Sequence, residues 1–141
     1  MNRDRFDKLY IQVINETTQL LLESKGAAKA IILSRDGVLM LQRSKDRRWH
    51  FPGSHLNKGE NFISCLKREL REELSQTIDR KPKALFDIDD TRVYKAKLIG
   101  KKIRLSHEHV GLKWIRVKDL HKMDLTKEAK KITQKLQRIR I

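Results

Sequence analysis

The sequence contains a single cysteine, Cys65, among 141 residues. One thiol excludes an internal disulfide and a zinc site built from several cysteines, so the composition favours a reducing, cytosol-like compartment. Cys65 falls within a predicted helix, on the side near a group of carboxylates. We expect it to pack in the interior rather than to react, because free cysteine behaves mainly as a small apolar residue.

Long apolar runs are also missing. No stretch approaches the roughly 20 apolar residues that a helix needs to cross a bilayer. The first ten residues contain acids and lack the apolar centre of a secretory signal. We therefore predict a soluble, unprocessed, cytoplasmic protein without membrane contact. Internal repeats and low-complexity linkers are absent as well, and the length fits one domain over residues 1–141.

Acidic residues are scarce, since 18 Asp and Glu stand against 33 Lys and Arg, for a net charge of +15. Such a surplus attracts nucleic acid and other polyanions, although it specifies none of them. The cations gather in a loop and on one side of a predicted C-terminal helix. They are Lys45, Arg47 and Arg48 in the loop, and Lys130, Lys131 and Lys135 on the helix. Two interpretations stay open, a solvated surface and contact with the phosphates of a nucleotide or an RNA.

Three of the acids form a tight group in a helix that we expect to begin near Asn61 and to end near Ser75. At about 100° per residue, Glu69, Glu72 and Glu73 fall within one arc of roughly 100°, beside an apolar stripe. Neighbouring carboxylates repel one another unless a cation lies among them. Mg²⁺ and Mn²⁺ take oxygen ligands and are commonly completed by substrate phosphates. The alternative is a solvated acidic face with salt bridges to basic residues of the same helix.

The segment 49–78 resembles the Nudix box and the residues before it. The box pattern is Gly, five residues, Glu, seven residues, then Arg-Glu-apolar-any-Glu-Glu-any-Gly-apolar. This chain matches it at Glu60 and continuously from Arg68 to Glu73. Upstream, residues 49–53 are similar to the Trp-x-x-Pro-Gly that precedes the box in many members. More weakly, the resemblance extends over residues 28–136.

Three positions depart from the box pattern. Ser54 and Ser75 stand where the family has glycine, and Gln76 stands where it has an apolar residue. If a glycine position requires positive φ, serine there costs on the order of 1 kcal/mol, which a folded domain tolerates. These side chains are not needed to hold a metal. The departures therefore bear on loop geometry and substrate fit more than on the helix.

The resemblance implies an α/β fold of Nudix type, an α/β/α sandwich with a mixed β-sheet between helices. It also implies a hydrolase that uses Mg²⁺ or Mn²⁺ to cleave the pyrophosphate link of a nucleoside-diphosphate derivative. Two alternatives stay open. One is a pyrophosphohydrolase of RNA 5′ ends, and the other is a catalytically weak module that binds nucleic acid or regulates.

Individual roles follow from the same resemblance. Glu69, Glu72 and Glu73 would hold the metal ion, and Arg68 would orient a glutamate through a salt bridge. Glu108 precedes a Trp-containing strand, where some members carry a further metal ligand or the base. The candidate substrate-binding residues are Arg43, Gly53, Ser54, Gly59 and Glu60. A cleft is expected between the helix and residues 53–60, with Glu108 across it, and Glu60 is a second candidate for ligand or base.

The rest of the chain predicts helices around a sheet. Residues 4–25 have the apolar spacing of a helix that stops at Gly26. Strands are expected at residues 28–34, 38–43, 84–89, 93–99 and 103–105, and at a segment leading to Trp114. A final helix over residues 126–139, which need not touch the metal site, would turn five apolar side chains inward. These are Leu125, Ala129, Ile132, Leu136 and Ile139.

Histidines offer a different metal site. On a strand, His107 and His109 would share one face, as zinc ligands do, but no further cluster of cysteine or histidine accompanies them. His50 and His55 are expected in loops rather than as ligands. Of these two, His50 lies near enough to the box to touch a substrate.

Overall fold

The computed structural model describes residues 26–100 and 102–141, and the predicted helix over residues 4–25 lies outside this part of the chain. Its strands are β1 (Ala27–Ser34), β2 (Gly37–Arg43), β3 (Trp49–His50), β4 (Gly53–His55), β5 (Lys83–Ile88), β6 (Thr91–Ala96) and β7 (His109–Ile115). The helices are α2 (Phe62–Leu74), the 3-10 helix η1 (Val117–Lys122) and α3 (Lys127–Leu136).

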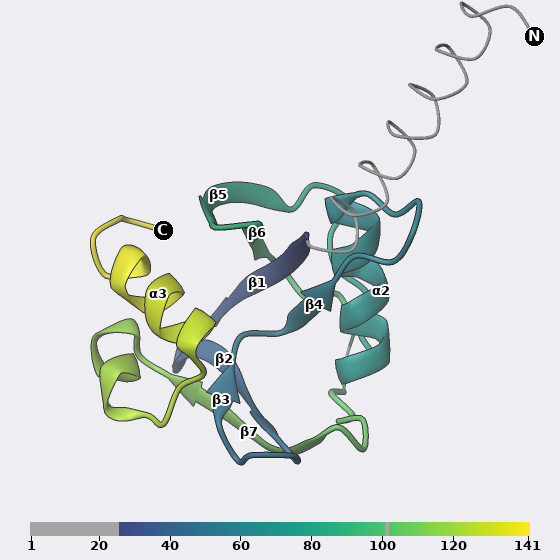
Figure 1. The fold of residues 1–141 in the computed structure, drawn as a ribbon. Coiled ribbons are helices and arrows are strands. Elements are labelled where there is room, and N and C mark those ends of the chain that lie inside the picture. The colour runs from purple at the N-terminus through teal and green to yellow at the C-terminus, as the bar shows by residue number, and fades with distance from the viewer. Residues whose placement is uncertain (1–25, 101) are drawn as a thin grey trace, which may run out of the picture.

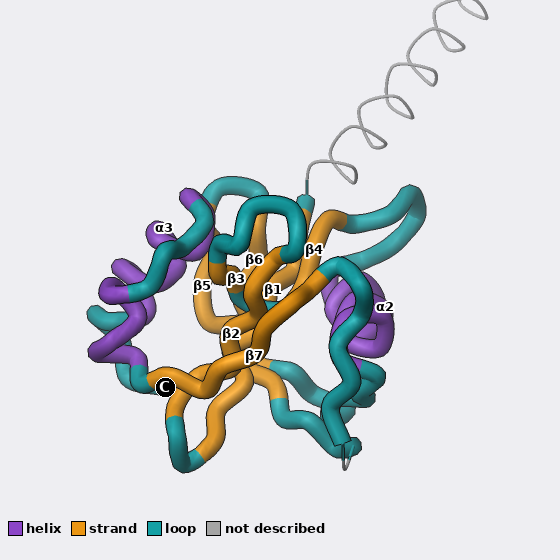
Figure 2. The backbone as a smooth tube through the Cα atoms, turned by 90° about the horizontal axis from the view of Figure 1, so that it is seen from below, coloured by secondary structure: helices purple, strands orange, loops and turns teal. Residues whose placement is uncertain are grey.

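The sheet lies between α2 on one side and α3 on the other (Figures 1 and 2). Strand β1 shows why, because its side chains alternate between two hydrophobic clusters. Ala30 and Ile32 belong to the cluster that includes the leucines of α2, whereas Ile31 belongs to the one that includes Ile132 and Leu136 of α3. Since β1 pairs in parallel with β6 and antiparallel with β2 and β4, the sheet is mixed, as predicted.

The sheet divides beside β1. Strands β1 and β2 pair next to their shared turn, where Leu33 faces Val38 and Ser34 faces Gly37. Beyond this point β1 continues with β4 and β6, while β2 continues with β3 and β7. Figure 1 shows the two groups of strands diverging. The cavity described below is lined by residues from both groups.

Helix α2 has the predicted limits because both of its ends are capped. The Asn61 side chain accepts a hydrogen bond from the Ser64 N–H, and Ser75 ends the helix in the left-handed region with φ 55°. Ser75 thus adopts the conformation that the family glycine would supply. Cys65 is fully buried, and burial raises the pKa of its thiol to about 12, which confirms the expected packing role.

Some predicted limits are wrong. Strand β6 ends at Ala96, and residues 102–106 form no strand. Their backbone bonds to the end of α2 instead, where the Arg104 N–H donates to the Leu74 carbonyl and the Ser106 N–H to the Glu73 carbonyl. Helix α3 ends at Leu136, so Ile139 is 38% exposed rather than inward. No helix within the described residues is long and apolar enough to span a membrane.

Candidate active site

A cavity of about 910 Å³ opens between the two groups of strands, α2 and the start of α3. Its lining includes six of the candidate catalytic and substrate-binding residues. They are Arg43, Gly53, Ser54, Glu69, Glu73 and Glu108. Glu108 is contributed by the segment before β7, away from α2 in the chain, so the predicted meeting of this residue with the helix carboxylates is observed.

Glu73 lies at the buried side of this cavity. Its Oε1 accepts a hydrogen bond of 2.7 Å from the Gly53 N–H, and its Oε2 lies 3.4 Å from His109 Nε2. Burial raises the pKa of the Glu73 carboxyl to about 8, although the charge of Lys29 acts in the opposite direction. The positive charge around Glu73 is therefore too weak to keep its carboxyl group ionised at neutral pH.

Arg68 joins three glutamates at the surface of α2. Its guanidinium contacts Glu60 at 2.7 Å, Glu69 at 2.7 Å and Glu72 at 3.1 Å. Arg68 holds the pKa of Glu60 below its ordinary value, whereas burial raises the pKa of Glu69 despite the same partner. The expected salt bridge is present. In addition, Nη2 of Arg68 donates a hydrogen bond to the His55 carbonyl, which fixes the arginine to the loop before the helix.

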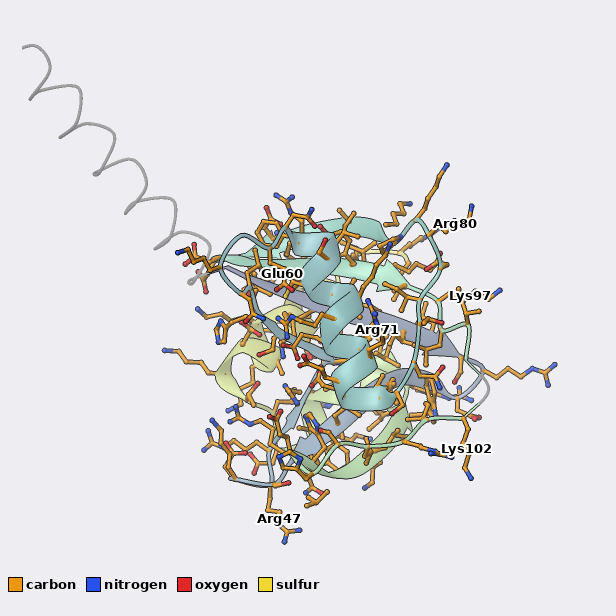
Figure 3. All side chains as sticks on the ribbon, turned by 90° about the vertical axis from the view of Figure 1, so that its right-hand side faces the viewer. Arg47, Glu60, Arg71, Arg80, Lys97 and Lys102 are labelled. Atoms are coloured by element: carbon orange, nitrogen blue, oxygen red, sulfur yellow. The ribbon has the colours of Figure 1, made fainter. Side chains whose placement is uncertain are left out.

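Part of the expected cleft lies elsewhere. The side chain of Glu72 is 59% exposed, and Glu72 does not line the cavity. Gly59 and Glu60 line a different cavity of about 530 Å³, together with Thr91 and Arg92. The reason is that the chain leaves the sheet after β4 and runs to the start of α2. Glu60 lies there, as Figure 3 shows. Of residues 53–60, Gly53, Ser54 and His55 line the larger cavity.

Lys29 is a cavity residue that the sequence reasoning missed. Its Nζ donates to the carbonyls of Phe51 at 3.0 Å and Gly53 at 2.8 Å, and lies 3.0 Å from His50 Nδ1. Glu128 of α3 approaches to 4.0 Å. Burial lowers the pKa of the Lys29 amine, while Glu73 opposes that shift. A lone lysine within the apolar run of β1 was the available signal, because a buried lysine requires partners.

The contact between His50 and His109 was also not expected from the sequence. Their Nε2 atoms are 2.7 Å apart, and their rings stack with centroids separated by 4.9 Å. Burial lowers the pKa of both imidazoles, which are therefore uncharged near neutral pH. His50 belongs to β3 rather than to a loop, and β7 begins at His109, so His107 precedes the strand and is exposed. The predicted shared face of His107 and His109 is wrong for that reason.

Cations border the cavity on two sides. Lys45 and Arg48 of the loop before β3 line it, and so does Lys127 in the first turn of α3. The start of the final helix also reaches the cavity, because Thr126, Lys127 and Glu128 all line it. Arg47, by contrast, lies at the outer tip of its loop (Figure 3). Positive charge therefore borders the cavity both at the loop before β3 and at the start of α3.

The raised pKa of Glu73 predicts a pH dependence for the metal-free protein. Its value of about 8 exceeds the ordinary 4.5, so the folded protein keeps a proton that the unfolded chain has lost across this range. The free energy of unfolding should therefore fall as the pH rises between these two values, and not below them. We expect the stability of wild type relative to Glu73→Gln, measured by urea denaturation in EDTA, to decline through this window. A difference independent of pH would contradict a buried, protonated Glu73.

Comparison with known proteins agrees with this geometry. The NUDIX domain matches residues 24–136. A protein from Chromobacterium violaceum assigned to the Nudix hydrolase family is 30% identical, with a TM-score of 0.67, over 80% of this chain and 77% of that one. An Ap4A hydrolase from C. elegans is 28% identical, with a TM-score of 0.59, over 79% of this chain and 95% of that one.

A Nudix hydrolase from Nitrosomonas europaea shows the fold alone. It is 17% identical, with a TM-score of 0.63, over 79% of this chain and 86% of that one. The curated proteins contain no match. The mixed sheet between α2 and α3 is thus a Nudix fold, as the sequence predicted.

Proposed function

The chain belongs to the Nudix hydrolase family, and we propose that it cleaves the pyrophosphate link of a nucleoside-diphosphate derivative with the help of Mg²⁺ or Mn²⁺. One observation supports this most strongly. Glu69 and Glu73, one turn apart on α2, line the same cavity as Arg43, Arg48 and Lys127. Carboxylates that can hold a divalent ion therefore lie within reach of cations that can hold phosphates.

The donor set fits a hard divalent ion. Glu69 and Glu73 present oxygen atoms from one helix face, and burial raises the pKa of both, as expected for carboxyl groups that lack a full complement of positive charge. Glu108 lies close enough to raise the pKa of Glu73 further. We propose Glu69 and Glu73 as the ligands, with Glu72 as a third from the exposed side. When bound, the ion would neutralise phosphate oxygens and lower the pKa of a water.

We propose that the remaining residues position the metal ligands and bind the substrate phosphates. Arg68 positions Glu69 through their 2.7 Å contact, and the Gly53 N–H fixes one oxygen of Glu73. Arg43, Lys45 and Lys127 would bind the phosphates of the substrate. Glu108 is the candidate that would take the proton from the attacking water, because it lines the same cavity as Glu69 and Glu73 and its charge acts on the Glu73 carboxyl.

A hydrolysis screen tests the proposal directly. The panel contains nucleoside triphosphates, dinucleoside polyphosphates, nucleotide sugars and 5′-triphosphate RNA, each with Mg²⁺ and with EDTA. We expect Mg²⁺-dependent release of a phosphorylated product from at least one small nucleotide. Cleavage of the RNA alone would replace this substrate class with RNA ends, and no release from any substrate would overturn the hydrolase proposal.

Lys127 offers a test of phosphate binding. Its replacement by glutamine removes one cation from the cavity, so we expect KM to rise about three- to tenfold with little change in kcat. The increase should shrink at high salt, because salt screens the lost attraction. Lys130→Gln is the matched control, since Lys130 is exposed one turn further along α3 and does not line the cavity. Equal kinetics for both variants would remove Lys127 from substrate binding.

A further inference from the structure

Three side chains that commonly bind transition metals meet at the cavity wall. Nitrogen atoms of His50 and His109 and a carboxylate oxygen of Glu73 all lie within 4.8 Å of one another. They come from three separate elements, β3, β7 and α2. Two imidazoles and one carboxylate form a donor set that occurs at zinc sites with a position left open for water.

The two distances that involve His109 are close to those that a bound ion requires. With Zn–N bonds of about 2.0–2.1 Å, two ligands of a tetrahedral ion are separated by roughly 3.3 Å. His109 Nε2 and Glu73 Oε2 are already 3.4 Å apart. The two Nε2 atoms are 2.7 Å apart, a distance at which a single proton bridges them. An ion in the place of that proton would need the rings to separate by roughly 0.6 Å.

Polar contacts hold two of the three donor atoms, those of His50 and Glu73, in this direction. Lys29 Nζ contacts Nδ1 of His50 at 3.0 Å, so the other ring nitrogen, Nε2, faces His109. The Gly53 N–H binds Oε1 of Glu73, which leaves Oε2 facing His109. The stacked rings restrict both imidazoles further. An ion at His50 Nε2 requires the tautomer that carries its proton on Nδ1, from which a neutral Lys29 amine can accept, and burial of Lys29 favours that neutral amine.

We propose that His50, Glu73 and His109 form a binding site for a transition-metal ion of the Zn²⁺ or Co²⁺ type. Its donors distinguish it from the proposed Mg²⁺ position, because Mg²⁺ takes oxygen ligands and imidazole favours transition metals. The two positions share Glu73, whose carboxylate has two oxygens. The site stands on geometry alone and does not depend on hydrolysis of any nucleotide.

Co²⁺ reports the donor set directly through its visible spectrum. The full chain is titrated with Co²⁺ in the absence of Mg²⁺, because Mg²⁺ would compete for the shared Glu73. We expect intense absorption bands of a four- or five-coordinate ion, with an equivalence point of one ion per chain, and displacement of these bands by Zn²⁺. A weak spectrum of six-coordinate Co²⁺ in the wild-type protein would overturn the proposal, whatever the variants do.

Variants then identify the ligands. His109→Gln and His50→Gln should each abolish the intense bands and weaken Zn²⁺ binding, measured by calorimetry, by at least tenfold. His55→Gln and His107→Gln are the matched controls, because both histidines line the same cavity and neither belongs to the group of three. Bands lost in a control, or kept in both ligand variants, would refute the assignment. Because binding is measured without substrate, its failure is separate from failure of the hydrolase proposal.

Discussion

Glu73→Gln is expected to lower kcat by about a thousandfold while leaving the fold intact. Glutamine keeps the shape of the side chain, and its carbonyl oxygen can still accept from the Gly53 N–H, which now donates to Oε1 at 2.7 Å. The substitution removes the charge that a divalent ion needs. Initial rates on the substrate found by the screen, with Mg²⁺ at saturation, measure the effect.

Arg71→Gln is the control for this variant. Arg71 lies on the same helix but on its outer face (Figure 3), so its loss should leave the rate near that of wild type. Thermal unfolding of both proteins would show whether the helix is intact. A Glu73→Gln rate within tenfold of wild type would remove the residue from the mechanism. Glu72→Gln should reduce the rate less than Glu73→Gln, because Glu72 is exposed and bound to Arg68.

Gly53→Ala is expected to destabilise the protein by about 3 kcal/mol or more. A Cβ at this position would lie 2.0 Å from the carbonyl oxygen of Ala28, and the residue has φ +119°, which side chains rarely adopt. The neighbouring strand cannot move away easily, because Gly53 pairs with Lys29 in the contact between β1 and β4. Urea denaturation of the two proteins gives the difference in the free energy of unfolding.

Gly59→Ala separates the crowding from the backbone strain. Gly59 also has positive φ, +77°, but a Cβ there meets nothing within 4 Å. This variant should therefore cost only about 1 kcal/mol. Equal losses for the two variants would show that the close approach of Gly53 to β1 does not determine stability. Activity should fall in Gly53→Ala alone, because Glu73 is bound to the Gly53 N–H.

The helix and the first hairpin could be predicted because their signals are local. The apolar spacing of α2 and its flanking Asn61 and Ser75 fixed both ends to within a residue. The turn at Gly37, with φ +125°, likewise falls between two apolar runs. The box pattern then identified Glu69 and Glu73, since positions one turn apart on a helix share a face whatever the tertiary structure is.

The rest of the site depends on contacts that have no local signal. Lys29 meets His50 because β1 pairs with β4, and His50 meets His109 because β2 lies between β3 and β7. The register of those strands decides which side chains become neighbours. The place of Lys127 was missed for the same reason, since its helix is fixed by a backbone bond from the Thr126 N–H to the Trp49 carbonyl.

The position of α3 has a consequence for how the protein is made. Strand β1 pairs with β6, and residues 126–128 form part of the cavity lining. Both segments are synthesised long after β1. Contacts between segments so far apart in the chain form late in folding. A nascent chain still attached to the ribosome before these residues emerge has the carboxylates of α2 but lacks the last wall of the cavity. We expect nucleotides to meet a working site only after release of that segment from the exit tunnel.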